Sequence, residues 1–298
     1  MTFQYQPRRT MLYVPAHRMR YLEKAKQLKA DSLIFDLQES VPPDYKNDAR
    51  NLLQKQLSGG QIYQAEKIIR INSLDSPWGM DDLKMVLSTD VDGILFPNID
   101  SAGQLKAVIS TLDESGSNQL DIMVNIESAK AIINCESICA ASDRLSTIIL
   151  GTTDLANSLR VTLNTERLAL ITSLSLAVLA ARAHNKFVID GPHLDLSDFT
   201  SSEFSCRQAR DLGFDGKAVI HPTQLAYTND AFTPKGDDVK KAKQIIEAIA
   251  QAHESGNSVA VIHNRLIEPS LEHWARRIIA LYNQVHQVGQ TDLIGPEK

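Results

Sequence analysis

The stretch STIILGTTDLA, residues 146 to 156, begins as an apolar run and ends on a carboxylate, Asp154. A short run of β-branched residues and leucine is typical of a buried β-strand. Gly151 and two threonines then turn the chain before the acid. A buried strand that ends in an ionisable side chain is typical of a parallel sheet with a polar site at the carboxyl ends of its strands.

Seven other short apolar runs end in polar residues in the same way, which makes eight strand candidates. They cover residues 11–16, 32–37, 67–72, 93–98, 122–127, 147–152, 186–191 and 217–222. Segments with helical spacing separate them, for example 20–30, 102–114, 129–141 and 202–213. Eight such units predict a (β/α)8 TIM barrel. A doubly wound open sheet is the alternative, but no glycine-rich dinucleotide motif follows the first strand candidate.

The chain is longer than a (β/α)8 barrel requires, and the additional residues lie at its C-terminal end. About 75 residues follow the eighth strand candidate, and they include the amphipathic segments 237–255 and 271–285. Such segments predict helices with one buried face. We therefore expect a barrel catalytic domain over residues 1–235 and a C-terminal helical extension over 236–298.

Composition and charge exclude several classes of protein. A net charge of −5 and a sequence pI near 5.9 argue against nucleic-acid binding. The first residues lack the apolar core of a secretory signal, and the most apolar segment, 168–184, is too short to span a bilayer and predicts a core helix. Three cysteines without a CxxC pair favour a reducing compartment. We expect a cytoplasmic protein that binds neither nucleic acid nor membranes.

Polar residues gather where the predicted strands end, which is the active face of a TIM barrel. In chain order they are Asp36 with Glu39, Arg70 with Asn72, Asn98, Glu127, Asp154, Asp190 and His221. Carboxylates that face one cavity repel one another unless a cation joins them. Oxygen ligands without a His or Cys cluster favour Mg²⁺, and Glu127 and Asp154 on adjacent strands are the best pair of ligands. In the alternative interpretation these acids pair with Arg70 or cap helices.

Arg70 lies inside an apolar strand candidate, so its guanidinium needs an anionic partner. The planar group suits a carboxylate or a keto acid, and an internal ion pair with Asp36 is the alternative. His221 has two possible roles: it is either a functional residue or a core histidine that is hydrogen-bonded to the backbone.

These stretches resemble the citrate lyase β-subunit (CitE-like) family of the HpcH/HpaI aldolase superfamily, which includes malyl-CoA and citramalyl-CoA lyases. The resemblance covers nearly the whole chain. It rests on ordered motifs such as RRTMLYVPA (8–16), IRINSLDSPWGMDDL (69–83), NIESAKAIIN (125–134), ILGTTDLANSL (149–159) and LGFDGKAVIHPTQLAYTNDAFTP (212–234).

The resemblance implies a TIM barrel and a role for each matched residue. Glu127 and Asp154 would bind Mg²⁺ directly, Arg70 would hold the keto acid part of the substrate, and Asp36 and Glu39 would support the water shell of the metal. It also implies assembly as trimers or hexamers, in which the C-terminal extension is a lid over a neighbour's site. The implied reaction is Claisen-type cleavage of a 3-hydroxyacyl thioester to an acetyl thioester and an α-keto acid.

The chain departs from the family pattern at several positions. Asn98 stands where a lysine is common, and an arginine expected near the first helix is replaced by Tyr21. We assign Asn98, Arg18, Arg20 and Lys24 to substrate or CoA binding; the alternative for the basic residues is a solvated helix face. In the lid, His263 and Asn264 replace an Asp-Gly pair whose aspartate protonates the enolate, and we predict that His263 is a catalytic residue.

The leading hypothesis is a Mg²⁺-dependent carbon–carbon lyase that acts on citramalyl-CoA, malyl-CoA or citryl-CoA, or on the corresponding carrier-protein thioester. The second hypothesis, suggested by His263, is a thioesterase or condensing enzyme of the same family. The third is a non-catalytic subunit that binds acyl-CoA.

Overall fold

The computed structural model describes residues 7–58, 63–116, 120–262 and 264–291. The chain forms two compact units, a barrel from Arg8 to Phe232 and an extension that begins at Thr233. Each unit has its own apolar core.

Eight parallel strands close the barrel, as the sequence predicts, and β1 pairs with both β2 and β8. The strands are β1 (Thr10–Pro15), β2 (Ser32–Asp36), β3 (Glu66–Arg70), β4 (Gly93–Phe96), β5 (Asp121–Ile126), β6 (Leu145–Leu150), β7 (Phe187–Asp190) and β8 (Gly216–Val219). All eight end one to three residues before the predicted boundary, so the polar residues near these boundaries belong to the loops or to strand ends at the mouth of the barrel.

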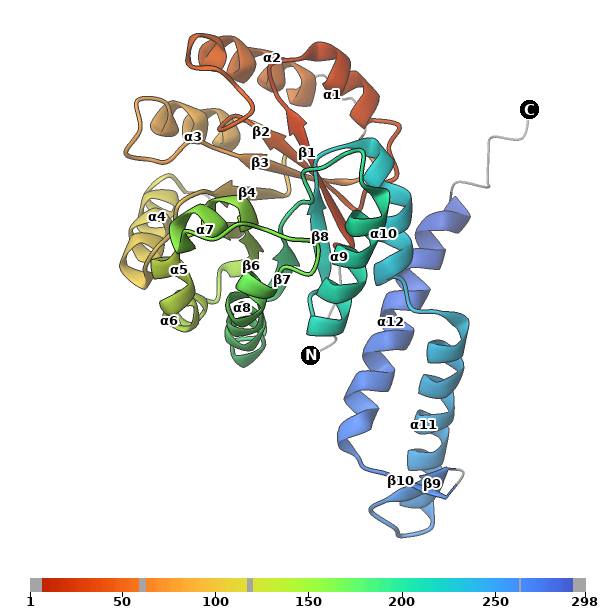
Figure 1. The fold of residues 1–298 in the computed structure, drawn as a ribbon. Coiled ribbons are helices and arrows are strands. Elements are labelled where there is room, and N and C mark those ends of the chain that lie inside the picture. The colour runs from red at the N-terminus through yellow and green to blue at the C-terminus, as the bar shows by residue number, and fades with distance from the viewer. Residues whose placement is uncertain (1–6, 59–62, 117–119, 263, 292–298) are drawn as a thin grey trace, which may run out of the picture. The chain divides into compact units, whose positions relative to one another are not determined.

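Helices follow the strands and surround the barrel (Figure 1). They are α1 (Met19–Ala25), α2 (Lys46–Ser58), α3 (Gly79–Leu87), α4 (Ala102–Glu114), α5 (Ala129–Ile133), α6 (Cys135–Ala140), α7 (Thr152–Leu159), α8 (Ile171–Ala183), α9 (Phe199–Leu212) and α10 (Leu225–Phe232). The predicted helix 129–141 is interrupted at Asn134, whose side-chain amide donates to the carbonyl of Asp100. Such a side-chain bond to backbone outside the helix competes with helical continuity.

One apolar residue from each strand fills the centre of the barrel. These residues are Met11, Ile34, Ile68, Leu95, Met123, Ile149, Ile189 and Ala218. Because side chains alternate between the two faces of a strand, the residue two positions later also points inward, one layer nearer the mouth. That relation places Asp36 above Ile34, Arg70 above Ile68 and Asn125 above Met123.

The opposite end of the barrel is closed by a buried ion pair between Arg8 and Glu66. The Glu66 carboxylate also accepts from Ser32, and Arg8 also donates to Thr147. These contacts join three strands at their amino ends, where the barrel fold places residues that serve stability.

The extension consists of α11 (Gly236–Glu254), the antiparallel hairpin β9 (Ala260–Ile262) and β10 (Arg265–Ile267), and α12 (Ser270–Thr291). The two predicted helices are therefore present. Ala242, Ile245, Ile249, Ala260, Ile267 and Ala275 form its core. His263 lies outside the described residues. In the described part of the chain, no helix is both long and apolar enough to cross a membrane.

Candidate functional site

A cavity of about 440 Å³ lies at the mouth of the barrel. Its wall contains Asp36, Glu39, Arg70, Glu127 and Asp154, which come from or follow β2, β3, β5 and β6. The structure therefore brings together five residues that the sequence predicts for one site.

Asp36 and Arg70 form a two-pronged ion pair. The Arg70 Nε lies 2.8 Å from Asp36 Oδ1, and Arg70 Nη2 lies 2.9 Å from Asp36 Oδ2. Burial alone would raise the pKa of Asp36, but the Arg70 guanidinium and hydrogen bonds from Arg70 and Ser40 hold it below its usual value. Asp36 is thus ionised, and it orients Arg70 instead of offering a free carboxylate to the cavity.

One edge of the Arg70 guanidinium is available to a ligand in the cavity. Its Nη2 also reaches Glu39 Oε2 at 3.4 Å, whereas Nη1 makes no hydrogen bond to any residue in the described ranges. The guanidinium carbon lies 4.6 Å from the centre of the Tyr13 ring. An arginine fixed in this way can receive a substrate carboxylate with little loss of side-chain freedom.

Glu127 follows β5 and is 7% exposed. Its Oε1 accepts from the backbone N–H of Asn98 at 2.8 Å, and its Oε2 accepts from Asn125 Nδ2 at 3.2 Å. Burial raises the pKa of Glu127, and the negative charges of Asp154 and Glu39 act in the same direction, against the Asn98 N–H and Arg70. The positive groups around Glu127 therefore do not balance the negative charge of its carboxylate.

The turn quoted at the start places Asp154 in the cavity wall. Gly151 follows β6, and a Cβ at this position would lie 2.7 Å from Glu127 Oε2. Only glycine allows the turn to pass so close to Glu127. Helix α7 then starts at Thr152, and Asp154 stands in its first turn with an exposed side chain.

The donor set of the cavity fits a hard divalent cation. Glu127 and Asp154 supply two carboxylates to one cavity, and Mg²⁺ commonly takes one or two carboxylates and completes its shell with water and substrate oxygens. Within the described ranges, no group of three His, Cys, Asp or Glu side chains converges as a dedicated metal cage would require. This donor set is compatible with Mg²⁺, whereas a structural zinc site would need four protein ligands.

Lys46 supports the loop after β2 and was not among the predicted site residues. Its Nζ donates to the carbonyls of Leu37 and Gln38 and to Asn72 Oδ1, at 2.8, 2.5 and 2.7 Å. One signal was available, because a lysine at the first position of a helix faces the positive end of the helix dipole and needs another partner.

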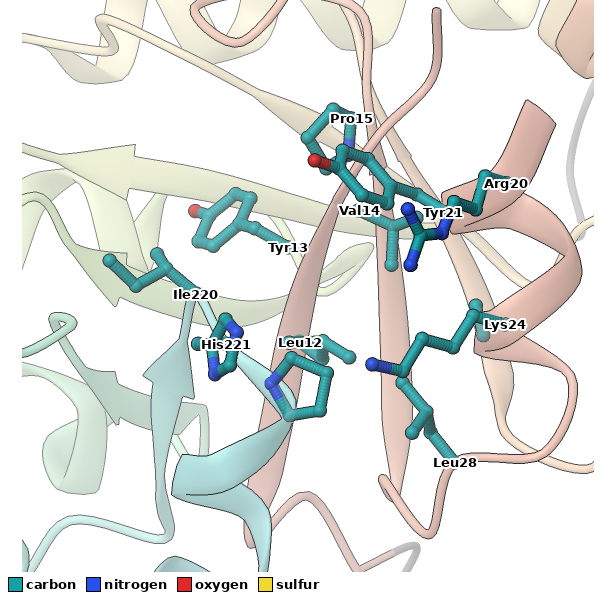
Figure 2. Close-up of a pocket in the computed structure, with 12 residues that line it drawn as sticks. Leu12, Tyr13, Val14, Pro15, Arg20, Tyr21, Lys24, Leu28, Ile220 and His221 are labelled. Carbon is teal, nitrogen blue, oxygen red and sulfur yellow. The ribbon is translucent and has the colours of Figure 1, made fainter. Parts of the chain in front are cut away.

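A second cavity of about 420 Å³ lies beside the first and is lined by Arg20, Lys24 and His221. Figure 2 shows the charged groups of Arg20 and Lys24 entering it from α1, with His221 on the other side. Neither cation forms an ion pair with a residue that the structure describes. Three residues line both cavities: Tyr13, Pro15 and Ile220.

Two other predicted binding residues do not line either cavity. Arg18 precedes α1, and its Nε donates to His17 Nε2 at 2.9 Å. Asn98 has a left-handed backbone conformation with φ of 57°, and its backbone N–H donates to Glu127.

The expectation that Asp190 faces the site is wrong. Ile189 points into the barrel, so Asp190 points outward, where it accepts from Lys217 at 2.5 Å and from Arg167 at 2.8 and 2.9 Å. Burial alone would raise the pKa of Asp190, but these two cations hold it below its usual value. Asp190 is a structural ion-pair residue.

Comparisons with known proteins agree with this geometry. Residues 9–222 match the family model described as HpcH/HpaI aldolase/citrate lyase. A (3S)-malyl-CoA thioesterase from Cereibacter sphaeroides is 37% identical over 268 residues, which are 90% of this chain and 92% of the relative. The citrate lyase subunit beta of Leuconostoc mesenteroides subsp. cremoris is 28% identical over 94% of this chain and 95% of its own length.

Among solved structures, the citrate lyase beta subunit from M. tuberculosis complexed with oxaloacetate and magnesium has a TM-score of 0.66 and 25% identity. The match covers 78% of this chain and all of that one. The family model spans most of the barrel, and the relatives extend over nearly the whole chain. The chain therefore belongs to the HpcH/HpaI aldolase/citrate lyase family.

Proposed function

We propose that this protein hydrolyses a short hydroxyacyl-CoA thioester of the malyl-CoA type with the help of Mg²⁺. The observation that carries the proposal is the pairing of an acid-lined cavity with a cationic one, joined at Tyr13, Pro15 and Ile220. A dicarboxylic acyl-CoA has matching parts, a polar acid head and a long phosphorylated arm. The relative at 37% identity, named a (3S)-malyl-CoA thioesterase, supports this substrate and this reaction.

The two cavities suggest how the substrate is held. Arg20 and Lys24 would receive phosphates of CoA, and the free Nη1 of Arg70 would receive the carboxylate of the acyl group. Glu127 and Asp154 would hold Mg²⁺ against the oxygens of the acyl head. The related subunit was crystallised with both oxaloacetate and magnesium, which supports this arrangement. When bound, Mg²⁺ polarises substrate oxygens and offsets developing negative charge.

Hydrolysis adds the oxygen of a water molecule to the thioester carbon and breaks the carbon–sulfur bond. CoA leaves as its thiol, the hydroxy acid leaves as its carboxylate, and one proton goes to solvent. During this step Arg70 fixes the acyl head, because Asp36 and Glu39 hold its guanidinium from the other side.

Carbon–carbon cleavage is the second candidate, and the likeness to citrate lyase beta subunits favours it. In that reaction the substrate hydroxyl loses its proton, the bond between the hydroxyl-bearing carbon and the α-carbon of the thioester breaks, and the resulting enolate takes a proton at carbon. The products are acetyl-CoA and an α-keto acid. His263, which replaces the usual lid aspartate in the sequence, would protonate the enolate.

We further propose that the extension acts as a lid on a second copy of the chain, in a homotrimer or hexamer. The hairpin turns apolar side chains outward, with Val261 64% and Leu266 58% exposed, while its Ala260 and Ile267 pack in the core of the extension. Exposed apolar groups on a short hairpin favour burial against another surface. Cytoplasmic location remains part of the proposal, supported by three buried free cysteines.

Product analysis tests the proposed function. Purified protein, (3S)-malyl-CoA and Mg²⁺ are expected to yield free CoA thiol and malate in equal amounts, without acetyl-CoA or keto acid. Acetyl-CoA with an equal amount of keto acid would establish the lyase instead. Tight binding of malyl-CoA by calorimetry without any product would support the non-catalytic subunit and overturn both enzymatic assignments.

A further inference from the structure

Tyr13 lies where the two cavities adjoin. It lies near the end of β1, its side chain packs against the inner apolar cluster, and it lines both cavities. In Figure 2 its hydroxyl points away from Arg20 and Lys24. The other two residues common to both cavities, Pro15 and Ile220, have apolar side chains.

The Tyr13 hydroxyl has unused hydrogen-bonding capacity. It makes no hydrogen bond to a residue within the described ranges, although the Arg70 guanidinium lies over its ring at 4.6 Å. Burial raises the pKa of Tyr13 to about 12; Arg70 opposes this shift, and the acids Asp36, Glu127 and Glu39 add to it. The phenol therefore keeps its proton at neutral pH and serves as a donor.

A thioester that spans both cavities must pass this point. This step rests on the proposed function, in which CoA lies near Arg20 and Lys24 and the acyl head lies near Arg70. The thioester carbonyl joins these two parts of the substrate, so it lies close to the residues that the cavities share. Both candidate reactions place negative charge on that carbonyl oxygen, as the oxyanion of a tetrahedral intermediate or as an enolate.

We propose that the Tyr13 hydroxyl donates a hydrogen bond to the thioester carbonyl oxygen and is a catalytic residue of the reaction. The bond strengthens as charge develops on that oxygen, so it lowers the barrier more than it tightens substrate binding. No proton is transferred from Tyr13. The Arg70 guanidinium above the ring holds the phenol in place.

Tyr13→Phe is the test, because it removes the hydroxyl and keeps the ring under Arg70. We expect kcat on malyl-CoA to fall about 100-fold, as for loss of one oxyanion donor, with KM, Mg²⁺ affinity and Tm little changed. Tyr227→Phe is the matched control: its hydroxyl bonds to Ser202 on α9, away from both cavities, and its kcat should stay within twofold of wild type. A kcat for Tyr13→Phe within threefold of wild type would overturn the inference and leave the proposed function standing.

A second measurement does not depend on turnover. Isotope-edited infrared spectroscopy of bound acetyl-CoA labelled at the thioester carbonyl should show a lower C=O stretching frequency with wild type than with Tyr13→Phe. Equal frequencies would overturn the inference even if the wild type is active. If the wild type produces nothing from malyl-CoA but the frequencies differ, the proposed function fails and the role of Tyr13 as carbonyl donor stands. Failure of the wild type to bind acetyl-CoA would overturn both.

Discussion

Glu127→Gln should lower kcat/KM by about a thousandfold or more while making the metal-free protein more stable. The substitution removes a charge that would hold Mg²⁺ and leaves an oxygen that still accepts from the Asn98 N–H. Stability rises because the wild-type carboxylate is buried with too little positive charge around it, which is why its pKa is raised. Initial rates at saturating Mg²⁺ and thermal unfolding with a chelator present measure the two effects.

Glu66→Gln is the matched control. Glu66 is as buried as Glu127, 6% against 7% exposed, but lies at the other end of the barrel and is paired with Arg8. Its neutralisation leaves a buried guanidinium without its main partner, so the protein should lose stability and keep its kcat/KM. If Glu127→Gln loses stability as Glu66→Gln does, the Glu127 carboxylate is already compensated within the fold and the cation site is misassigned.

Arg70→Met should lower kcat/KM by about a hundredfold to a thousandfold, because the anchor of the acyl carboxylate is lost. It also leaves Asp36 buried and unpaired, which should lower the free energy of unfolding by about 3–5 kcal/mol at pH 7. Asp36 has a lowered pKa in the wild type, so its stabilising contribution is lost as pH falls through that pKa. In the variant Asp36 can take up a proton instead, and the difference in stability should shrink as pH falls from 7 to about 4.

Two further variants distinguish the role of Arg70 in binding the acyl carboxylate from its role in the ion pair with Asp36. Arg70→Lys keeps the charge but loses the planar fork, so activity should stay low while part of the stability returns. Arg182→Met removes another arginine that is paired with a buried aspartate, Asp215, and neither residue lines either cavity. It should lower stability and leave kcat/KM within about twofold. Equal losses of activity in Arg182→Met and Arg70→Met would show that the activity effect is only a loss of folded protein.

The sequence was sufficient for the barrel and for the acids of its mouth. Seven of the eight strand candidates are short apolar runs with a polar residue at or near their carboxyl end, and parallel strands bring all these ends to one rim. This rule brings Asp36, Glu39, Arg70, Glu127 and Asp154 to one rim. It also includes Asp190, which the structure places outside the barrel. The internal pair of Arg70 with Asp36, first given as an alternative, is present in the structure.

Which face of a strand a residue occupies was harder to predict. Strands covered on both sides are apolar at every position, so the sequence lacks the alternation that would show which residues point inward. For this reason Asp190 could not be told from Asp36, although one pairs with Lys217 outside the barrel and the other with Arg70 inside it.

Contacts made by the backbone and by loops also could not be predicted from the sequence pattern. Asn98 contributes its N–H from a left-handed conformation, which the identity of its side chain does not reveal. The contacts of Lys46 depend on how the loop after β2 folds back onto α2. Arg18, Arg20 and Lys24 were predicted together, but only Arg20 and Lys24, four residues apart on one face of α1, line the second cavity, and Arg18 precedes the helix.

The location of the divalent cation tests the central claim most directly. Crystals grown with Mn²⁺ in place of Mg²⁺ and with a bound dicarboxylic keto acid such as oxaloacetate should give one strong anomalous peak in the barrel mouth. We predict that it lies about 2.1 Å from a carboxylate oxygen of Glu127 and of Asp154, with the remaining ligands from water and the keto acid. A peak bound by neither residue, or a keto acid bound in the cavity without any cation, would contradict the account.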